Sequence, residues 1–142
     1  MHITALYGGL LGLLLALLSA RVMLWRFMTG VVVGDEGDAE KTAMIRAHGN
    51  FIEYVPLTIL LIGLAEYLAI GSKSFLSIKT GQTWPPLLIH GLGITLVLGR
   101  VLHAAGMWKN PGISMGRRVG TAMTMIALCG AAILTTYLGF TL

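Results

Sequence analysis

Three stretches of the chain carry no charged residue over a length sufficient to cross a bilayer. They run over residues 1–20, 80–99 and 119–142. About 20 helical residues cross the roughly 30 Å hydrocarbon core of a membrane. A fourth stretch, 51–70, holds Glu53 and Glu66 on either side of a charge-free centre, and it is long enough to span if each acid lies near one interface. The sequence therefore predicts four transmembrane helices.

The composition leaves too few charges for a water-soluble surface. Charged residues make up 11% of the chain and apolar residues 56%, whereas soluble domains carry about 25% charged residues. A single cysteine, Cys129, excludes an internal disulfide framework. Residues 1–9 lack the Lys or Arg that opens a signal peptide, so we expect an anchored first helix. The expected fold is one all-α integral membrane domain over residues 1–142, with spans near 3–26, 44–70, 83–107 and 117–140.

Basic residues are distributed unevenly among the expected connections. Lys73 and Lys79 lie between spans two and three. Eight others lie at or near the ends that join spans one to two and three to four: Arg21, Arg26, Lys41, Arg46, Arg100, Lys109, Arg117 and Arg118. Because loops rich in Lys and Arg stay in the cytoplasm, both termini are expected to be non-cytoplasmic. The net charge of +4 thus indicates orientation in a membrane, and no nucleic-acid partner is expected.

Polar side chains form a stripe at the start of the second span. At about 100° per residue, Asn50 lies about 40° from Arg46 and Glu53 about 20° on the other side, with Tyr54 on the flank. Ionisable groups at membrane depth usually face a bundle interior or a wet cavity. The stripe is either a ligand site or a self-satisfied polar cluster that fixes helix packing, and Pro56, which kinks the helix beyond it, fits both interpretations.

Further cationic side chains are expected near this stripe. Arg100, His103 and Met107 share one face of the third span, and Arg117 and Arg118 precede the fourth. Arginines in excess over acids beside a membrane cavity indicate an anionic ligand with carboxylate-like groups. The four histidines form no HExxH motif and the chain has no CxxC motif, so no metal site is expected.

The segment Arg46-Ala-His-Gly-Asn50-Phe-Ile-Glu53-Tyr54-Val-Pro56 resembles the signature of the MAPEG family, the membrane-associated proteins in eicosanoid and glutathione metabolism. The preceding Gly-Asp-x-Gly-Asp loop and the later Gly-Arg-x-x-His also resemble its bacterial branch, and the similarity extends over about residues 21–124. This resemblance implies a left-handed four-helix bundle, assembled as a homotrimer in a bacterial inner membrane. Glutathione would bind between subunits near the cytoplasmic face. Two pairs of glycines at i, i+4 spacing, at Gly8 and Gly116, would favour close helix contacts in such a trimer.

The resemblance also implies a site, residue by residue. It assigns glutathione contacts to Arg26, Arg46, His48, Asn50, Glu53, Tyr54 and His103. The arginine that opens the fourth span and stabilises the thiolate corresponds to Arg117, with Arg118 as the close alternative. Met107 stands where several eukaryotic members carry a tyrosine, which removes one hydroxyl contact.

These assignments imply a glutathione transferase, or a peroxidase, that uses glutathione as co-substrate and attacks lipophilic electrophiles delivered from the bilayer. A free thiol has a pKa of roughly 8.5. To lower that pKa by two units, the site must stabilise the thiolate over the thiol by about 2.7 kcal/mol. A partly desolvated arginine beside the sulfur can supply this. Two alternatives remain open: a non-catalytic lipid-binding or scaffold member of the same family, and a small multidrug-type transporter.

Overall fold

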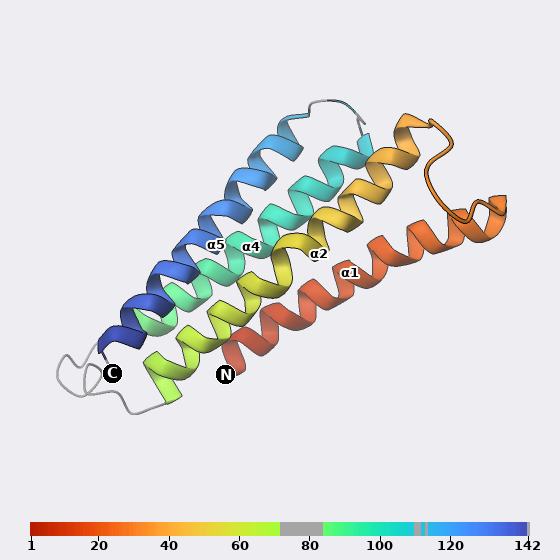
Figure 1. Cartoon of the computed structure of the whole chain (residues 1–142). Coiled ribbons are helices and arrows are strands. Elements are labelled where there is room, and N and C mark those ends of the chain that lie inside the picture. Colours follow the sequence, from red (N-terminus) through yellow and green to blue (C-terminus); the bar gives the residue numbers. More distant parts are fainter. Residues whose placement is uncertain (72–83, 110–111, 113, 142) are drawn as a thin grey trace.

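The chain forms four long helices in the computed structural model, which describes residues 1–71, 84–109, 112 and 114–141. They are α1 (His2–Thr29), α2 (Ala39–Glu66), α4 (Trp84–Lys109) and α5 (Met115–Thr141), and one π-helical turn, η1 (Tyr67–Gly71), extends α2. Both termini lie at one end of the bundle, and the loop from α1 to α2 lies at the other (Figure 1). The predicted all-α, four-helix membrane fold is confirmed. Lys73 and Lys79 lie outside the described residues.

The helices are longer than the spans expected from the charge pattern. At 1.5 Å per residue, the 28 residues of α1 extend about 42 Å, which exceeds the roughly 30 Å hydrocarbon core. The charged residues at their ends can therefore lie in the headgroup region while the helix continues. Large apolar side chains cover the outer faces, such as Leu13, Leu17 and Ile133, which are 66–70% exposed. An apolar exterior of this kind suits lipid and not water.

Local signals fix the loop between α1 and α2. Gly30 ends α1 in the left-handed conformation, at φ 74°, and its N–H donates to Arg26 O at 2.9 Å. The Asp38 carboxylate begins α2 by accepting hydrogen bonds from Glu40 N at 2.7 Å and Lys41 N at 3.2 Å. Towards this loop α1 leans away from α2 (Figure 1), so the bundle is more open at the loop end.

At the opposite end, a carboxylate of α2 caps α1. The Glu66 side chain is 1% exposed. It accepts hydrogen bonds from Ile3 N at 3.1 Å, Thr4 N at 2.7 Å and Thr4 Oγ1 at 2.5 Å. These backbone donors belong to the first turn of α1, where a helix has no partners of its own for its N–H groups. The contact ties the two helices together in a fixed register.

Two further polar contacts link helices in the interior. The Tyr7 hydroxyl of α1 lies 2.8 Å from His90 Nδ1 of α4. The Thr135 hydroxyl of α5 donates to Leu61 O of α2 at 2.9 Å. Hydrogen bonds between helices add to packing in membranes, where the alternative is an unsatisfied polar group in hydrocarbon. His90 is therefore an interhelical hydrogen-bonding residue, as expected from its place in mid-span.

Glycines bring α4 and α5 into backbone contact. A Cβ on Gly120 would lie 2.5 Å from Gly99 O and 2.5 Å from His103 N, and a Cβ on Gly116 would lie 2.9 Å from Leu102 O. The two helices pack this closely because neither glycine carries a side chain. The expectation that the small-residue face at Gly116 supports contacts between subunits is corrected: this face is occupied within one chain.

Candidate functional site

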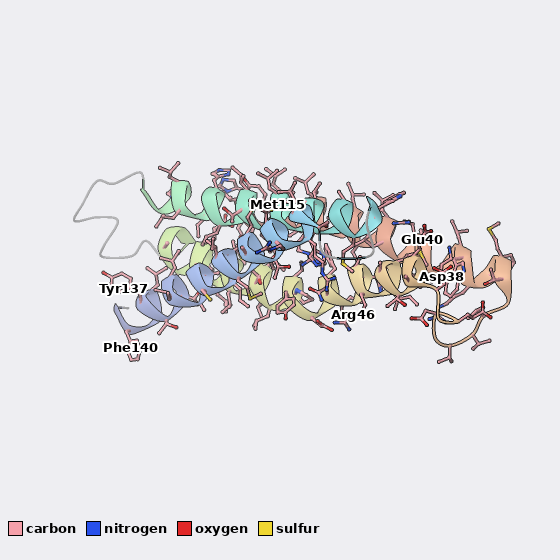
Figure 2. The ribbon with its side chains drawn as sticks, turned by 90° about the horizontal axis from the view of Figure 1, so that it is seen from above. Asp38, Glu40, Arg46, Met115, Tyr137 and Phe140 are labelled. Carbon is pink, nitrogen blue, oxygen red and sulfur yellow. The ribbon has the colours of Figure 1, made fainter. Side chains whose placement is uncertain are left out.

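The predicted stripe lies on the outer face of α2, in the half of the bundle that holds the α1–α2 loop. The side chains of Arg46 and Glu53 are 57% and 48% exposed, and Arg46 Nη1 lies 3.8 Å from Glu53 Oε1. Asn50 and Tyr54 are half-buried beside them. Figure 2 shows Arg46 nearer to Met115, at the start of α5, than to Tyr137 at the far end. The ion pair is loose, so both groups keep hydrogen-bonding capacity for a ligand.

Behind the stripe, α4 contributes a buried cation. Arg100 is 1% exposed and His103 is 2% exposed, and Arg100 Nη2 lies 3.3 Å from His103 Nδ1. The guanidinium carbon lies 5.6 Å from the centre of the Phe51 ring. Arg100 Nε has no hydrogen-bond partner. Burying a charge is costly unless it is paired, so this side chain is poised to receive an anion.

The start of α5 adds two exposed arginines to the same region. The Ser114 hydroxyl donates to Gly106 O at 2.9 Å and accepts from Arg117 N at 3.2 Å, which anchors α5 to the end of α4. Arg117 and Arg118 both line a shallow depression on the surface of α5. The glycine contact described above holds this helix end against α4, so the position of Arg117 is set by backbone packing.

Electrostatic proximity joins these groups into one region. Glu53 lies close enough to Arg100, and Arg117 close enough to His103, for their charges to interact. Among the described residues, neither Arg100 nor Arg117 forms an ion pair with a carboxylate. The region therefore combines α2, α4 and α5 and has more cationic donors than acids.

Two predicted contact residues lie elsewhere in the single chain. His48 Nε2 lies 3.0 Å from Ser19 Oγ, on the side of α2 that packs against α1. Arg26 donates to Val32 O and, at 3.5 Å, to Gly34 O, so it holds the α1–α2 loop. Within one chain Arg46, Asn50, Glu53 and Tyr54 share one face of α2. Arg100 connects this face to His103, and Arg117 lies near His103 with Arg118 beside it. The contacts of His48 and Arg26 lie elsewhere.

Sequence reasoning counted Arg100 among the nearby cations but did not name it as a contact residue. The available signal was its spacing, because an arginine three residues before His103 shares its helical face. Met107, on the same face, is also buried, at 5% exposure. The described residues contain no group of three or more His, Cys, Asp or Glu side chains that could hold a metal ion.

Chemically, the region can bind an anion that offers more than one acceptor. Guanidinium groups pair with carboxylates through two parallel hydrogen bonds. The Glu53 carboxylate can accept a hydrogen bond from an ammonium or amide of the same ligand. A carboxylate of such a ligand would give Arg100 the anionic partner that it lacks among the described residues.

Comparison with known proteins gives concordant results. The sequence profile of the MAPEG family matches residues 4–137. The chain is 33% identical over 118 residues to the inner membrane protein YecN of Escherichia coli strain K12, covering 79% of each chain. The same identity and coverage hold for the inner membrane protein YecN of Escherichia coli O6:H1, strain CFT073.

Proposed function

Because the chain belongs to the MAPEG family, we propose that it is a membrane-embedded glutathione transferase that conjugates the glutathione thiolate to lipophilic electrophiles. Its four apolar helices and its inner-membrane relatives support an integral inner membrane protein. Glutathione carries two carboxylates, one ammonium and one thiol. These groups match a region rich in arginine that also contains one available acid.

The observation that carries the proposal is the buried side chain of Arg100. It is 1% exposed, it contacts no carboxylate of the described residues, and its Nε has no partner. A cation that served packing alone would be expected to have a buried acid beside it. An anionic ligand supplies that missing partner.

The proposed chemistry begins at the glutathione sulfur. Arg117 lies at the start of α5 close to His103, where its guanidinium would favour the thiolate over the thiol. The thiolate is the reactive nucleophile, and an electrophile dissolved in the bilayer meets it near the membrane boundary. Holding both reactants in one site adds a gain from proximity. A peroxidase reaction would start from the same thiolate.

The exposure of the stripe supports a site completed by a second copy of the chain. Arg46 and Glu53 are about half-exposed on the outside of one subunit, although charged groups at membrane depth are not left facing lipid. A homotrimer, as the family resemblance implies, would cover them. It would also give Arg26 and His48 a route to the ligand from a neighbouring subunit. The positions of the termini and the cytoplasmic location of the site belong to this proposal.

The acids of α2 argue against a multidrug-type transporter. Such a protein would need an acidic residue in mid-span that is free to exchange cations and protons. Glu66 is buried and engaged as the cap of α1. Glu53 lies in the middle of α2 but 3.8 Å from Arg46, in a region where arginines outnumber acids, which suits an anion and not a cation. The non-catalytic alternative is favoured by one residue, Met107, which offers no hydroxyl at a position where several family members have one.

Titration calorimetry with reduced glutathione in mild detergent tests the proposal. The wild-type protein should bind, and Glu53→Gln should weaken binding about tenfold, the cost of one charge-assisted hydrogen bond. The matched control is Glu36→Gln in the α1–α2 loop, which should bind as the wild type does. Absence of any heat of binding in a protein that is folded and trimeric by mass measurement would refute the proposal. Binding without turnover of an aryl halide would favour the non-catalytic alternative.

A further inference from the structure

A cavity of about 200 Å³ lies at the loop end of the bundle, between α1, α2 and α4. We call it the interface pocket, and its lining residues are Arg21, Glu40, Ala43, Met44, Ala47, Ala104, Met107 and Trp108. It shares Met107 with the helical face that carries Arg100 and His103, but it otherwise lies apart from the proposed glutathione site. On α2, Ala47 points about 100° away from Arg46 around the helix axis, and α5 contributes nothing to the lining.

The interface pocket holds one cation and one anion that do not pair with each other. The Arg21 guanidinium carbon lies 3.5 Å from the centre of the Trp108 ring. Within the described part of the chain, neither Arg21 nor Glu40 forms an ion pair. Glu40 lies in the first turn of α2 and is labelled in Figure 2. A cavity with two unpaired opposite charges favours a ligand that is itself zwitterionic.

The depth of the interface pocket indicates where such a ligand comes from. Glu66 meets Ile3 at the other end of the bundle, and a charged side chain there belongs near an interface. Arg21 lies 18 residues further along α1, which is about 27 Å at 1.5 Å per residue. That distance is close to the roughly 30 Å thickness of the hydrocarbon core. The interface pocket therefore lies at headgroup level, where Trp side chains such as Trp108 concentrate.

An apolar track leads from the pocket into the bilayer. Trp108, at the rim, shares a face of α4 with Val101, Leu98 and Ile94 by their helical spacing. These three side chains are 45%, 49% and 47% exposed. They offer a continuous surface for an acyl chain that begins at the headgroup. The cavity itself is smaller than the roughly 300–1,000 Å³ of pockets for drug-sized ligands, so it suits a small headgroup.

We propose that the interface pocket binds phosphatidylethanolamine, with the phosphate on Arg21, the ammonium on Glu40 and an acyl chain along the outer face of α4. The guanidinium fork matches phosphate oxygens. The primary ammonium has N–H donors for the Glu40 carboxylate. A choline headgroup lacks those donors, and a glycerol headgroup lacks the cation. The pocket thus selects this headgroup over those of phosphatidylcholine and phosphatidylglycerol.

Native mass spectrometry of the delipidated protein with three lipids of identical acyl chains tests this selection. The wild type should bind phosphatidylethanolamine about tenfold more tightly than phosphatidylcholine or phosphatidylglycerol. Arg21→Gln should weaken binding about tenfold or more, the size expected of lost charge-assisted hydrogen bonds. Glu40→Gln should remove the preference over phosphatidylcholine. Lys41→Gln and Glu36→Gln, the matched controls, should change neither quantity, and glutathione binding should be unaltered in all four variants.

Two results would overturn the proposal. One is equal affinity of the wild type for the three lipids. The other is displacement of the lipid by an equal concentration of soluble O-phosphoethanolamine, because the ligand would then be a free phosphorylated amine. Glu40 lies in an exposed first turn, so Glu40→Gln is expected to fold even if Arg21→Gln does not. Arg21→Lys then serves as the second variant, because it keeps the positive charge but loses the paired donors of the guanidinium. Its affinity for phosphatidylethanolamine should lie between those of the wild type and Arg21→Gln.

Discussion

Replacing Gly120 by alanine should destabilise the bundle more than its size suggests. The new Cβ would lie 2.5 Å from Gly99 O, 2.5 Å from His103 N and 2.8 Å from His103 Cα, against 3.4 Å or more for ordinary contact. All three atoms belong to backbone, so no side chain can move aside. The two shortest of these distances fall about 0.9 Å short of 3.4 Å, so α4 and α5 must move apart to make room for the new Cβ.

The magnitude follows from two opposing terms. Overpacking costs about 1–3 kcal/mol, and a rigid backbone neighbour favours the upper end. Alanine regains up to about 1 kcal/mol over glycine in a helix interior. The net expected loss for Gly120→Ala is about 2 kcal/mol. The matched variant is Gly91→Ala in α4, because a Cβ there meets nothing within 4 Å, and it should be neutral or slightly stabilising.

Unfolding in mixed micelles, followed by circular dichroism as the fraction of denaturing detergent rises, measures both variants. The difference between them should be about 2–3 kcal/mol, since the gain in helix propensity is common to both and cancels. Equal stability of Gly120→Ala and Gly91→Ala would mean that α4 and α5 do not meet at backbone distance. Backbone packing against α4 would then not set the position of Arg117 either.

Three other outcomes are expected. Glu66→Gln should lower the free energy of unfolding by about 2–3 kcal/mol, because a buried charge-assisted cap is replaced by a neutral amide; unchanged unfolding would refute the cap. Arg117→Ala should raise the pKa of bound glutathione towards roughly 8.5, read from thiolate absorbance, whereas Arg118→Ala should change it little; the reverse result would exchange their roles. Hydrogen bonds from the Thr42 hydroxyl and then a backbone N–H hold the pKa of Asp35 below its ordinary value. The stabilisation that these hydrogen bonds give is fully present above the ordinary pKa of Asp35 and is lost as the pH falls through its lowered pKa in the folded protein. Amide-exchange protection of residues 30–38 should therefore fall in acid in the wild type. Asp35→Asn should show no such step.

The fold was predictable because the strongest constraint is local. Runs without charge identify the spans, and the turn residues Gly30 and Asp38 act within a few positions of the helix ends that they fix. The shared face of Arg100, His103 and Met107 was also predictable, since helical spacing alone places them together. All three are buried.

Contacts between distant segments could not be predicted in this way. Nothing in the pattern around Glu66 indicates that it caps α1, because the donors are 62 and 63 residues away. The spacing of Gly116 and Gly120 predicts a close helix contact but not the partner helix, and the partner is α4 of the same chain. Likewise Arg26 is basic and well placed in sequence, yet its hydrogen bonds go to the α1–α2 loop. The roles of these residues toward glutathione stay predictions.

The cap that Glu66 provides also bears on how the protein enters its membrane. During synthesis α1 emerges before α2, so the amide groups of Ile3 and Thr4 precede the carboxylate that satisfies them. Until then these first-turn N–H groups, which have no partner within their own helix, depend on water at the membrane boundary. The first helix thus reaches its final energy only when the second arrives beside it, which makes the α1–α2 hairpin the unit of insertion.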